Sequence, residues 1–296
     1  MADFRIDQAA GLRRLLGGGR HLQVITFVAG SEGVGRSVAV ANLGVALARQ
    51  GKEVMIIDEN TPGDDIASAF GLRARFDLLN VVSQEASLAQ VFVQPMQGLR
   101  VLPASRAVKK LGGLTLTQQR ALLDAMSSLE RPLDVILVDA SMAHPGGFSP
   151  FGLLSQEAVV VLSANGASIT EAYSLIKKVS LSFARRHFRI LVNKVRNLAD
   201  ARSVFENIAH VAAHKGVAKL DLAGAIPLDE ALRQAAQVCR PVLLQQPTAP
   251  ASNALREIAS DMLYWQRSES ELAGVEQFMQ QLLHVSQRIT PVAARA

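Results

Sequence analysis

The chain has 296 residues, of which 49% are hydrophobic and 19% charged, a composition typical of a globular protein and not of a disordered or fibrous one. Its formal net charge is +5, but the basic residues are spread along the chain in short pairs, so no direct contact with nucleic acid is expected. The single cysteine, Cys239, excludes an internal disulfide, and no run of residues is as long and apolar as a membrane-spanning helix. We therefore expect a cytoplasmic protein.

Short apolar runs alternate with helical patterns along the chain. The runs predict strands over residues 22–29, 53–58, 99–104, 134–139, 158–163, 188–193 and 222–227. The helical patterns cover residues 37–51, 116–129, 168–183 and 199–214. The strand candidates are almost continuously apolar, as in strands that are buried on both faces. The alternation therefore predicts an α/β fold with a mostly parallel, doubly wound sheet flanked by helices.

Two terminal segments lie outside this pattern. Residues 7–16 form a short amphipathic helix that is followed by three glycines, so we expect residues 1–20 to be a partner-docking arm with a flexible linker. Residues 21–266 form the α/β domain, and residues 267–296 form a C-terminal amphipathic helix and tail.

One face of that last helix is apolar and needs a partner; it carries Phe278, Leu282, Val285 and Ile289. Its polar side is rich in glutamine and poor in lysine and arginine, whereas a helix on an anionic membrane is expected to be basic. Packing on the body or on another protein is therefore favoured, and peripheral attachment to a membrane stays as the alternative.

The residues from Gly30 to Ser37 stand between a buried strand and a helix, the position of a phosphate-binding loop. Glycines at positions 30, 33 and 35 allow a tight turn whose N–H groups, with the helix N-terminus, favour an anion. The spacing matches G-x-x-x-x-G-K-[ST] except that Arg36 replaces the lysine. The hydroxyl of Ser37 is the group that would serve Mg²⁺ in such a loop.

Two predicted strands end in an aspartate, Asp58 and Asp139. The carboxyl ends of parallel strands open onto one crevice, so both carboxylates are expected beside the glycine loop. Mg²⁺ keeps several waters and takes few protein ligands. The sequence therefore predicts a magnesium site formed by Ser37, Asp58 and Asp139, largely through water.

With these motifs the chain resembles the MinD/ParA superfamily of P-loop ATPases, and within it the flagellar-number regulators of the FlhG/FleN family. The resemblance covers nearly the whole chain and is carried by residues 31–37, 98–105, 133–141, 191–208 and 224–237. It implies a MinD-like fold that binds ATP and Mg²⁺, with Asn193 recognising the adenine base. The implied nucleotide-binding residues are Gly30, Ser31, Gly33, Val34, Gly35, Arg36, Ser37 and Asn193.

The N-terminal arm carries the element that marks the flagellar branch, formed by Asp7, Gln8, Leu12 and Arg13 among others. In that branch it is similar to the activator segment that engages the signal-recognition-type GTPase FlhF. The resemblance thus implies an antiactivator-type regulator of flagellar number, placement and biosynthesis. Its implied partners are the FlhF-type GTPase, flagellar basal-body proteins and a flagellar transcription activator. The implied location is the cytoplasm, with peripheral association at the inner membrane or cell pole.

The chain departs from the superfamily pattern in residues 139–143 and, more consequentially, at three positions that are charged in the superfamily. Ser31 replaces the lysine that reaches across an ATP-held homodimer, Arg36 replaces the loop lysine, and Asn60 stands at the position of the catalytic aspartate. The first change argues against dimerisation on ATP, and the last removes a general base. We therefore expect very slow or absent hydrolysis and assign no catalytic residue. The alternatives are a ParA-like ATPase that partitions DNA or positions cargo, and a nucleotide-independent pseudo-ATPase scaffold.

Overall fold

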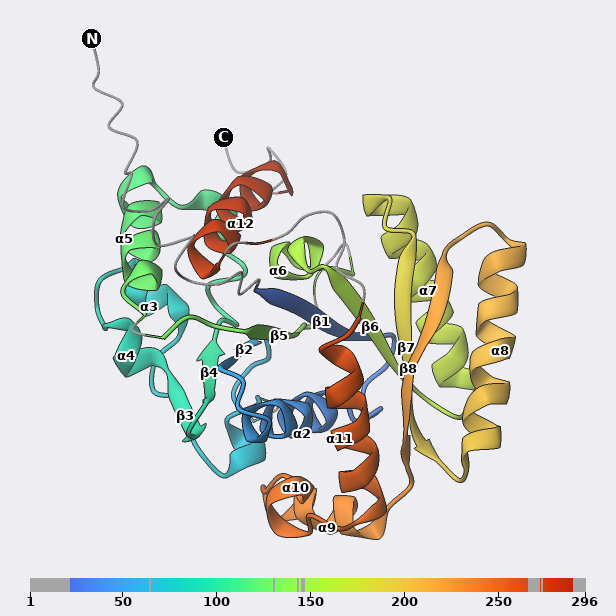
Figure 1. The fold of residues 1–296 in the computed structure, drawn as a ribbon. Helices are drawn as coiled ribbons and strands as arrows, with labels where there is room; N and C mark the ends of the chain where they lie inside the picture. Colours follow the sequence, from blue (N-terminus) through green and yellow to red (C-terminus); the bar gives the residue numbers. More distant parts are fainter. Residues whose placement is uncertain are drawn as a thin grey trace.

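The computed structural model describes residues 22–63, 65–129, 131–142, 144, 147–265, 272 and 274–289, and of Ile289 it describes the backbone alone. Within these residues one sheet has the strand order β3-β4-β2-β5-β1-β6-β7-β8 (Figure 1). The strands are β1 (Gln23–Ala29), β2 (Val54–Asp58), β3 (Val93–Met96), β4 (Leu99–Pro103), β5 (Val135–Asp139), β6 (Glu157–Ser163), β7 (His187–Val195) and β8 (Lys219–Pro227).

The strands are joined mainly by helices, as right-handed βαβ crossovers require. The longer helices are α2 (Arg36–Arg49), α5 (Leu116–Ser127), α7 (Gly166–Phe183), α8 (Leu198–His214), α9 (Glu230–Gln237), α11 (Pro250–Met262) and α12 (Val275–Ile289). Shorter helical segments are η1 (Ser68–Phe70), α3 (Leu78–Val82), α4 (Leu88–Val91), η2 (Leu111–Gly113), α6 (Pro150–Leu154) and α10 (Val242–Gln245).

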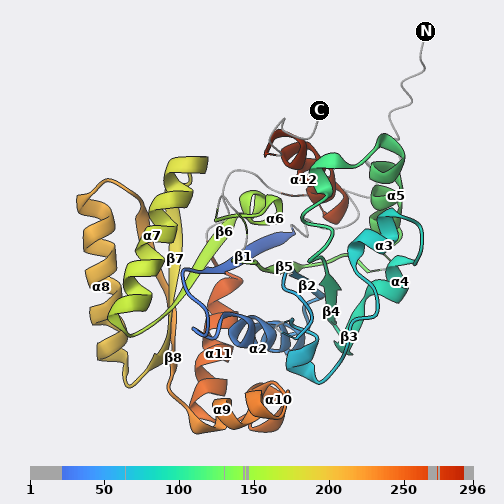
Figure 2. The ribbon, with the colours of Figure 1, turned by 180° about the vertical axis from the view of Figure 1, so that it is seen from behind.

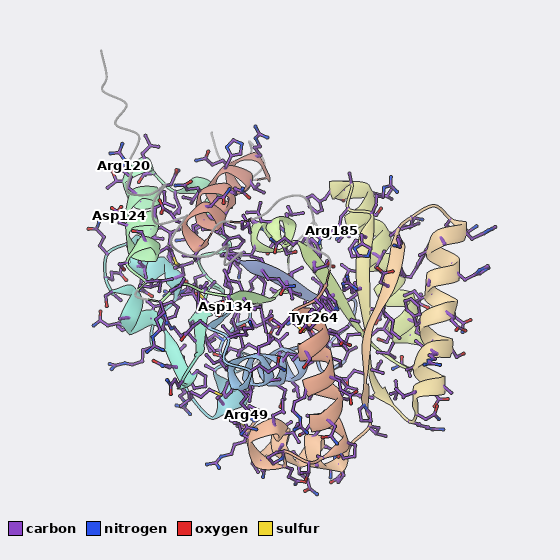
Figure 3. All side chains as sticks on the ribbon, in the orientation of Figure 1. Arg49, Arg120, Asp124, Asp134, Arg185 and Tyr264 are labelled. Atoms are coloured by element: carbon purple, nitrogen blue, oxygen red, sulfur yellow. The ribbon has the colours of Figure 1, made fainter. Side chains whose placement is uncertain are left out.

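Two apolar cores cover the two faces of the sheet, as the near-continuous apolar strands predict. On β1, Val24 and Val28 enter the core shared with α3 to α8 and α12, whereas Ile25 and Phe27 enter the core shared with α2, α10 and α11. Figures 1 and 2 show α2, α9, α10 and α11 on one side of the sheet and α5, α6 and α12 on the other. Arg49 at the end of α2, labelled in Figure 3, donates from Nη1 to the Leu243 carbonyl of α10 at 2.6 Å and so joins these two helices.

All seven strands and the four internal helices expected from the sequence are present, so the α/β prediction is confirmed. Strand β3 was not expected. It pairs antiparallel with β4 at one edge of the sheet and contains Pro95, which lacks the N–H needed in a central strand. Its four partly exposed residues lack the apolar run by which the other strands are recognised.

Helix α12 packs against η2, α5 and α6 on the face of the sheet opposite α2 (Figure 1). Phe278 and Leu282 are fully buried, and the ring of Phe278 lies 6.4 Å from that of Phe151 in α6, between ring centroids. Val285 is half-buried, and the side chain of Ile289 lies outside the described residues. The sequence left open whether the protein body, another protein or a membrane covers this apolar face. In this structure the protein body covers Phe278 and Leu282, so these two side chains are not available to a membrane.

The arm residues Asp7, Gln8, Leu12 and Arg13 lie outside the described residues. In the part of the chain that the structure does describe, no helix has both the length and the apolar character that crossing a bilayer requires.

Candidate functional site

The glycine loop runs from the end of β1, in the middle of the sheet, to the first turn of α2. Gly33 and Gly35 adopt positive φ values of 69° and 86°, which side chains of L-residues rarely tolerate. Gly30 packs so closely on α7 that a β-carbon there would lie 2.4 Å from the backbone of Glu171. Gly35 is the N-cap of the 14-residue helix α2. The predicted loop therefore leads into a helix N-terminus, whose free N–H groups favour an anion.

Asn193 holds this loop from inside the protein. It ends the apolar part of β7, is 3% exposed, and donates from Nδ2 to the Val34 carbonyl at 2.7 Å. Its Oδ1 accepts a bond from the backbone N–H of Lys194 at 2.9 Å. Both ends of the amide expected to read adenine are thus engaged within the chain.

Lys194 is a second loop contact, which the sequence did not suggest. It adopts a φ of 59°, and its Nζ donates to the Gly33 carbonyl at 2.6 Å. The only sequence signal for this role is its position directly after Asn193. Ser31 is partly exposed and Glu32 is exposed, and both line the cavity beside the loop.

Asp58 and Asp139 lie side by side because β2 and β5 pair in parallel with these residues in register. Both carboxylates are buried, and Asn60 joins them: its Nδ2 donates to Asp58 Oδ1 at 2.9 Å and to Asp139 Oδ2 at 2.7 Å. The expected convergence of the two strand ends beside the loop is therefore present.

The guanidinium of Arg36 lies on this acidic pair and not along the loop. Its Nε is 2.5 Å from Asp139 Oδ1, and its Nη2 donates to Asn60 Oδ1 at 2.7 Å. The side chain of Ser37 also hydrogen-bonds to Asp139. The cation that the sequence assigned to phosphate is paired with a carboxylate.

Glu59 is a further buried acid, which sequence reasoning overlooked although it directly follows Asp58. It accepts hydrogen bonds from the Ser149 hydroxyl and, at 3.0 Å, from the Ser141 N–H. Burial raises the pKa of Glu59 from 4.5 to about 7. Burial, followed by the neighbouring charge of Asp139, raises the pKa of Asp58 to about 7. Burial also raises the pKa of Asp139, against the opposing effect of Arg36.

A cavity of about 1170 Å³ lies over these groups, lined by the loop, Glu59 and Asn60. Its lining also includes Lys109 near η2, His144, and Ser286 of α12. Ligand pockets commonly measure roughly 300–1,000 Å³, so the cavity has room for a nucleotide.

The residues as they lie do not fit a magnesium ion. Each of the four carboxylate oxygens of Asp58 and Asp139 already accepts a hydrogen bond from the protein: Asp58 Oδ1 from Asn60, Asp58 Oδ2 from the Ile66 N–H, Asp139 Oδ1 from Arg36 and Asp139 Oδ2 from Asn60. The described residues also contain no group of three or more His, Cys, Asp or Glu side chains that could hold a metal.

Comparison with known proteins places this arrangement among nucleotide-binding proteins. The chain is 29% identical over 262 residues to a protein named Antiactivator FleN from Pseudomonas aeruginosa, covering 88% of this chain and 94% of that protein. It is 24% identical over 246 residues to the septum site-determining protein MinD of Bacillus subtilis, covering 81% of this chain and 89% of that protein.

The fold is also that of solved MinD structures. A chain of the MinC:MinD cell division protein complex of Aquifex aeolicus superposes with a TM-score of 0.64 at 24% identity, covering 83% of this chain and 97% of that one. MinD from Pyrococcus horikoshii, solved with Mg-ADP, gives a TM-score of 0.60 at 18% identity, covering 81% of this chain and 95% of that one. The family described as the CobQ/CobB/MinD/ParA nucleotide binding domain matches residues 25–242, and the chain belongs to it.

Proposed function

We propose that the protein is an antiactivator-type regulator of flagellar number, placement and biosynthesis, a MinD-like ATP-binding protein with weak or absent ATP hydrolysis. The observation that carries the proposal is the similarity to the antiactivator FleN, which extends over 88% of this chain and 94% of that protein. A sequence similarity that extends over nearly both whole chains favours a shared function over a shared fold with different functions.

The arrangement of polar groups in the crevice is a reason to expect that ATP hydrolysis is slow or absent. A general base must accept a proton from the attacking water, and Asn60 has no ionisable group for this. Its amide is held by Asp58, Asp139 and Arg36. Arg36 is itself paired with Asp139, so it does not lie free to stabilise charge on a transferring phosphoryl group.

Regulation would therefore pass through protein contacts. The proposed partners are a flagellar transcription activator, basal-body proteins and an FlhF-type GTPase, the last engaged through residues 7–16. The amphipathic pattern of this arm and the three glycines that follow it support a tethered docking segment.

Counting flagella by electron microscopy tests the cellular role. Cells from which the gene is deleted should carry an abnormal number of flagella, and the wild-type gene should restore the normal number. A normal count in the deleted cells would overturn the proposal. On the purified protein, phosphate release from ATP should stay close to the buffer background, whereas steady turnover would contradict the account of Asn60.

The docking arm has its own test. Replacing Gln8 and Leu12 by alanine in the full chain should abolish its stimulation of an FlhF-type GTPase. The exposed Arg202 on α8 offers a control, since Arg202→Lys should leave stimulation intact.

A further inference from the structure

Two of the departures from the superfamily pattern meet in space. Arg36 and Asn60 are 24 positions apart in the sequence, yet Arg36 Nη2 donates to Asn60 Oδ1 at 2.7 Å. The lysine-to-arginine and aspartate-to-asparagine changes therefore form one contact. An aspartate at position 60 would accept from Arg36 but would lose the three Nδ2 bonds, one to Asp58 and two to Asp139.

The positive charge of Arg36 compensates the negative charge of the carboxylates at which a magnesium ion is expected. Asp139 is fully buried, and two carboxylates in register repel each other unless a cation or protons compensate them. The guanidinium supplies that cation from within the chain, 2.5 Å from Asp139 Oδ1. The Asn60 amide adds hydrogen bonds to both carboxylates, from Nδ2 to Asp58 Oδ1 and to Asp139 Oδ2.

Magnesium would have to displace this arrangement. The ion binds proteins through one or two carboxylates and keeps most of its water, so its protein contacts are few and cannot readily compensate for breaking a buried ion pair. Displacing Arg36 would also require a new partner for the guanidinium. Apart from a phosphate group of the ligand, the other acids of the crevice are Asp58 and Glu59, which are buried and already hydrogen-bonded.

We propose that Arg36 and Asn60 together take the place of the magnesium ion, so that this crevice excludes divalent metal and any nucleotide there is held without one. The inference deepens the proposed function and rests on it for the nature of the ligand. The groups left to hold the phosphates are the backbone N–H groups of the loop at the N-terminus of α2.

Manganese binding, followed through the electron paramagnetic resonance signal of free Mn²⁺, tests the proposal on the full chain. Wild-type protein should take up no Mn²⁺, with or without ADP. The variant carrying both Arg36→Lys and Asn60→Asp should take up Mn²⁺ when ADP is present. Arg202→Lys is the matched control and should behave as wild type. Circular dichroism establishes that each variant is folded.

Uptake of Mn²⁺ by the wild-type protein would overturn the proposal, as would a folded double variant that takes up none. If the double variant does not fold, Arg36→Lys alone serves in its place under the same criteria.

A calorimetric titration of wild-type protein with ADP gives an independent reading. The heat of binding should be the same in magnesium and in EDTA, and an affinity at least about tenfold higher in magnesium would overturn the inference. The flagellar count separates the two proposals: metal uptake with an abnormal count in deleted cells rejects only the metal exclusion. A normal count with no metal uptake rejects only the cellular role.

Discussion

The side-chain amide of Asn193 and the backbone of Val34 are joined by a 2.7 Å hydrogen bond, across 159 positions of sequence. This contact fixes the glycine loop to strand β7 and leaves almost no space around Gly35, where a β-carbon would lie 2.4 Å from Asn193 Nδ2. The geometry of the loop thus depends on a neighbouring strand as well as on its own glycines.

Gly35→Ala should therefore destabilise the protein for two separable reasons. The left-handed backbone costs a non-glycine residue about 1–2 kcal/mol, and the collision with Asn193 adds to this. Gly33→Ala is a matched control, because Gly33 has a similar φ of 69° but nothing within 4 Å of its β-carbon. Urea unfolding should show a larger loss for Gly35→Ala. Asn193→Ala should relieve part of that loss in the double variant, and strictly additive losses would contradict this account.

Glu59 should make stability depend on pH. Because burial raises its pKa from 4.5 to about 7, the folded protein keeps a proton that the unfolded chain has lost. The free energy of unfolding should then fall as pH rises through this interval, by about 3 kcal/mol in total. The contribution is fully present below pH 4.5 and is lost above pH 7.

Glu59→Gln should remove this dependence and make the variant more stable than wild type at pH 8 but not at pH 4. Urea unfolding across this range provides the measurement, with Glu257→Gln on the exposed side of α11 as control. Asp58 contributes a similar slope that both proteins retain. Parallel curves for wild type and Glu59→Gln would rule out a titrating Glu59.

Arg36→Ala should destabilise the fold more at pH 8 than at pH 5. It leaves Asp139 buried without its cation, and breaking a buried pair by removing one partner costs about 3–5 kcal/mol. At low pH the carboxyl can take up a proton instead, so the loss shrinks. Arg233→Ala breaks an exposed pair with Glu230 and should change nothing measurable. An equal loss at both pH values would show that Arg36 stabilises by packing and not by charge.

Phe278→Ala tests the docking of α12. The ring is fully buried against Phe151, and truncating such a residue costs about 3–5 kcal/mol in thermal or urea unfolding. Leu116→Ala, at a side chain that is 72% exposed, should stay within about 0.5 kcal/mol of wild type. An unchanged stability for Phe278→Ala would mean that α12 is not packed on the body in solution.

The sequence was sufficient for the backbone of the site. Asp58 and Asp139 could be brought together because each ends a predicted strand, and parallel strands share one carboxyl edge. The loop could be located because its glycines stand between a buried strand and a helix. These are local patterns, and they determine where main-chain atoms lie.

Side-chain pairings escaped prediction where they depend on distant partners. The sequence pattern assigned Arg36 to phosphate, and its contacts with Asp139 and Asn60 depend on residues 103 and 24 positions away. The buried Glu59 accepts a hydrogen bond from Ser149, which is 90 positions away. The apolar face of α12 showed that a cover was needed, but not that α5 and α6 provide it.

The first described residue, Leu22, is joined through its backbone to Leu272, which lies near the C-terminal end of the described chain. Leu22, just before β1, forms an isolated antiparallel bridge with Leu272, just before α12, through a 3.1 Å bond from the Leu22 N–H to the Leu272 carbonyl. Both side chains are buried in the same core. Tension applied to the chain at Leu22 is therefore transmitted through this bridge to Leu272, directly before the C-terminal helix, and not only along β1.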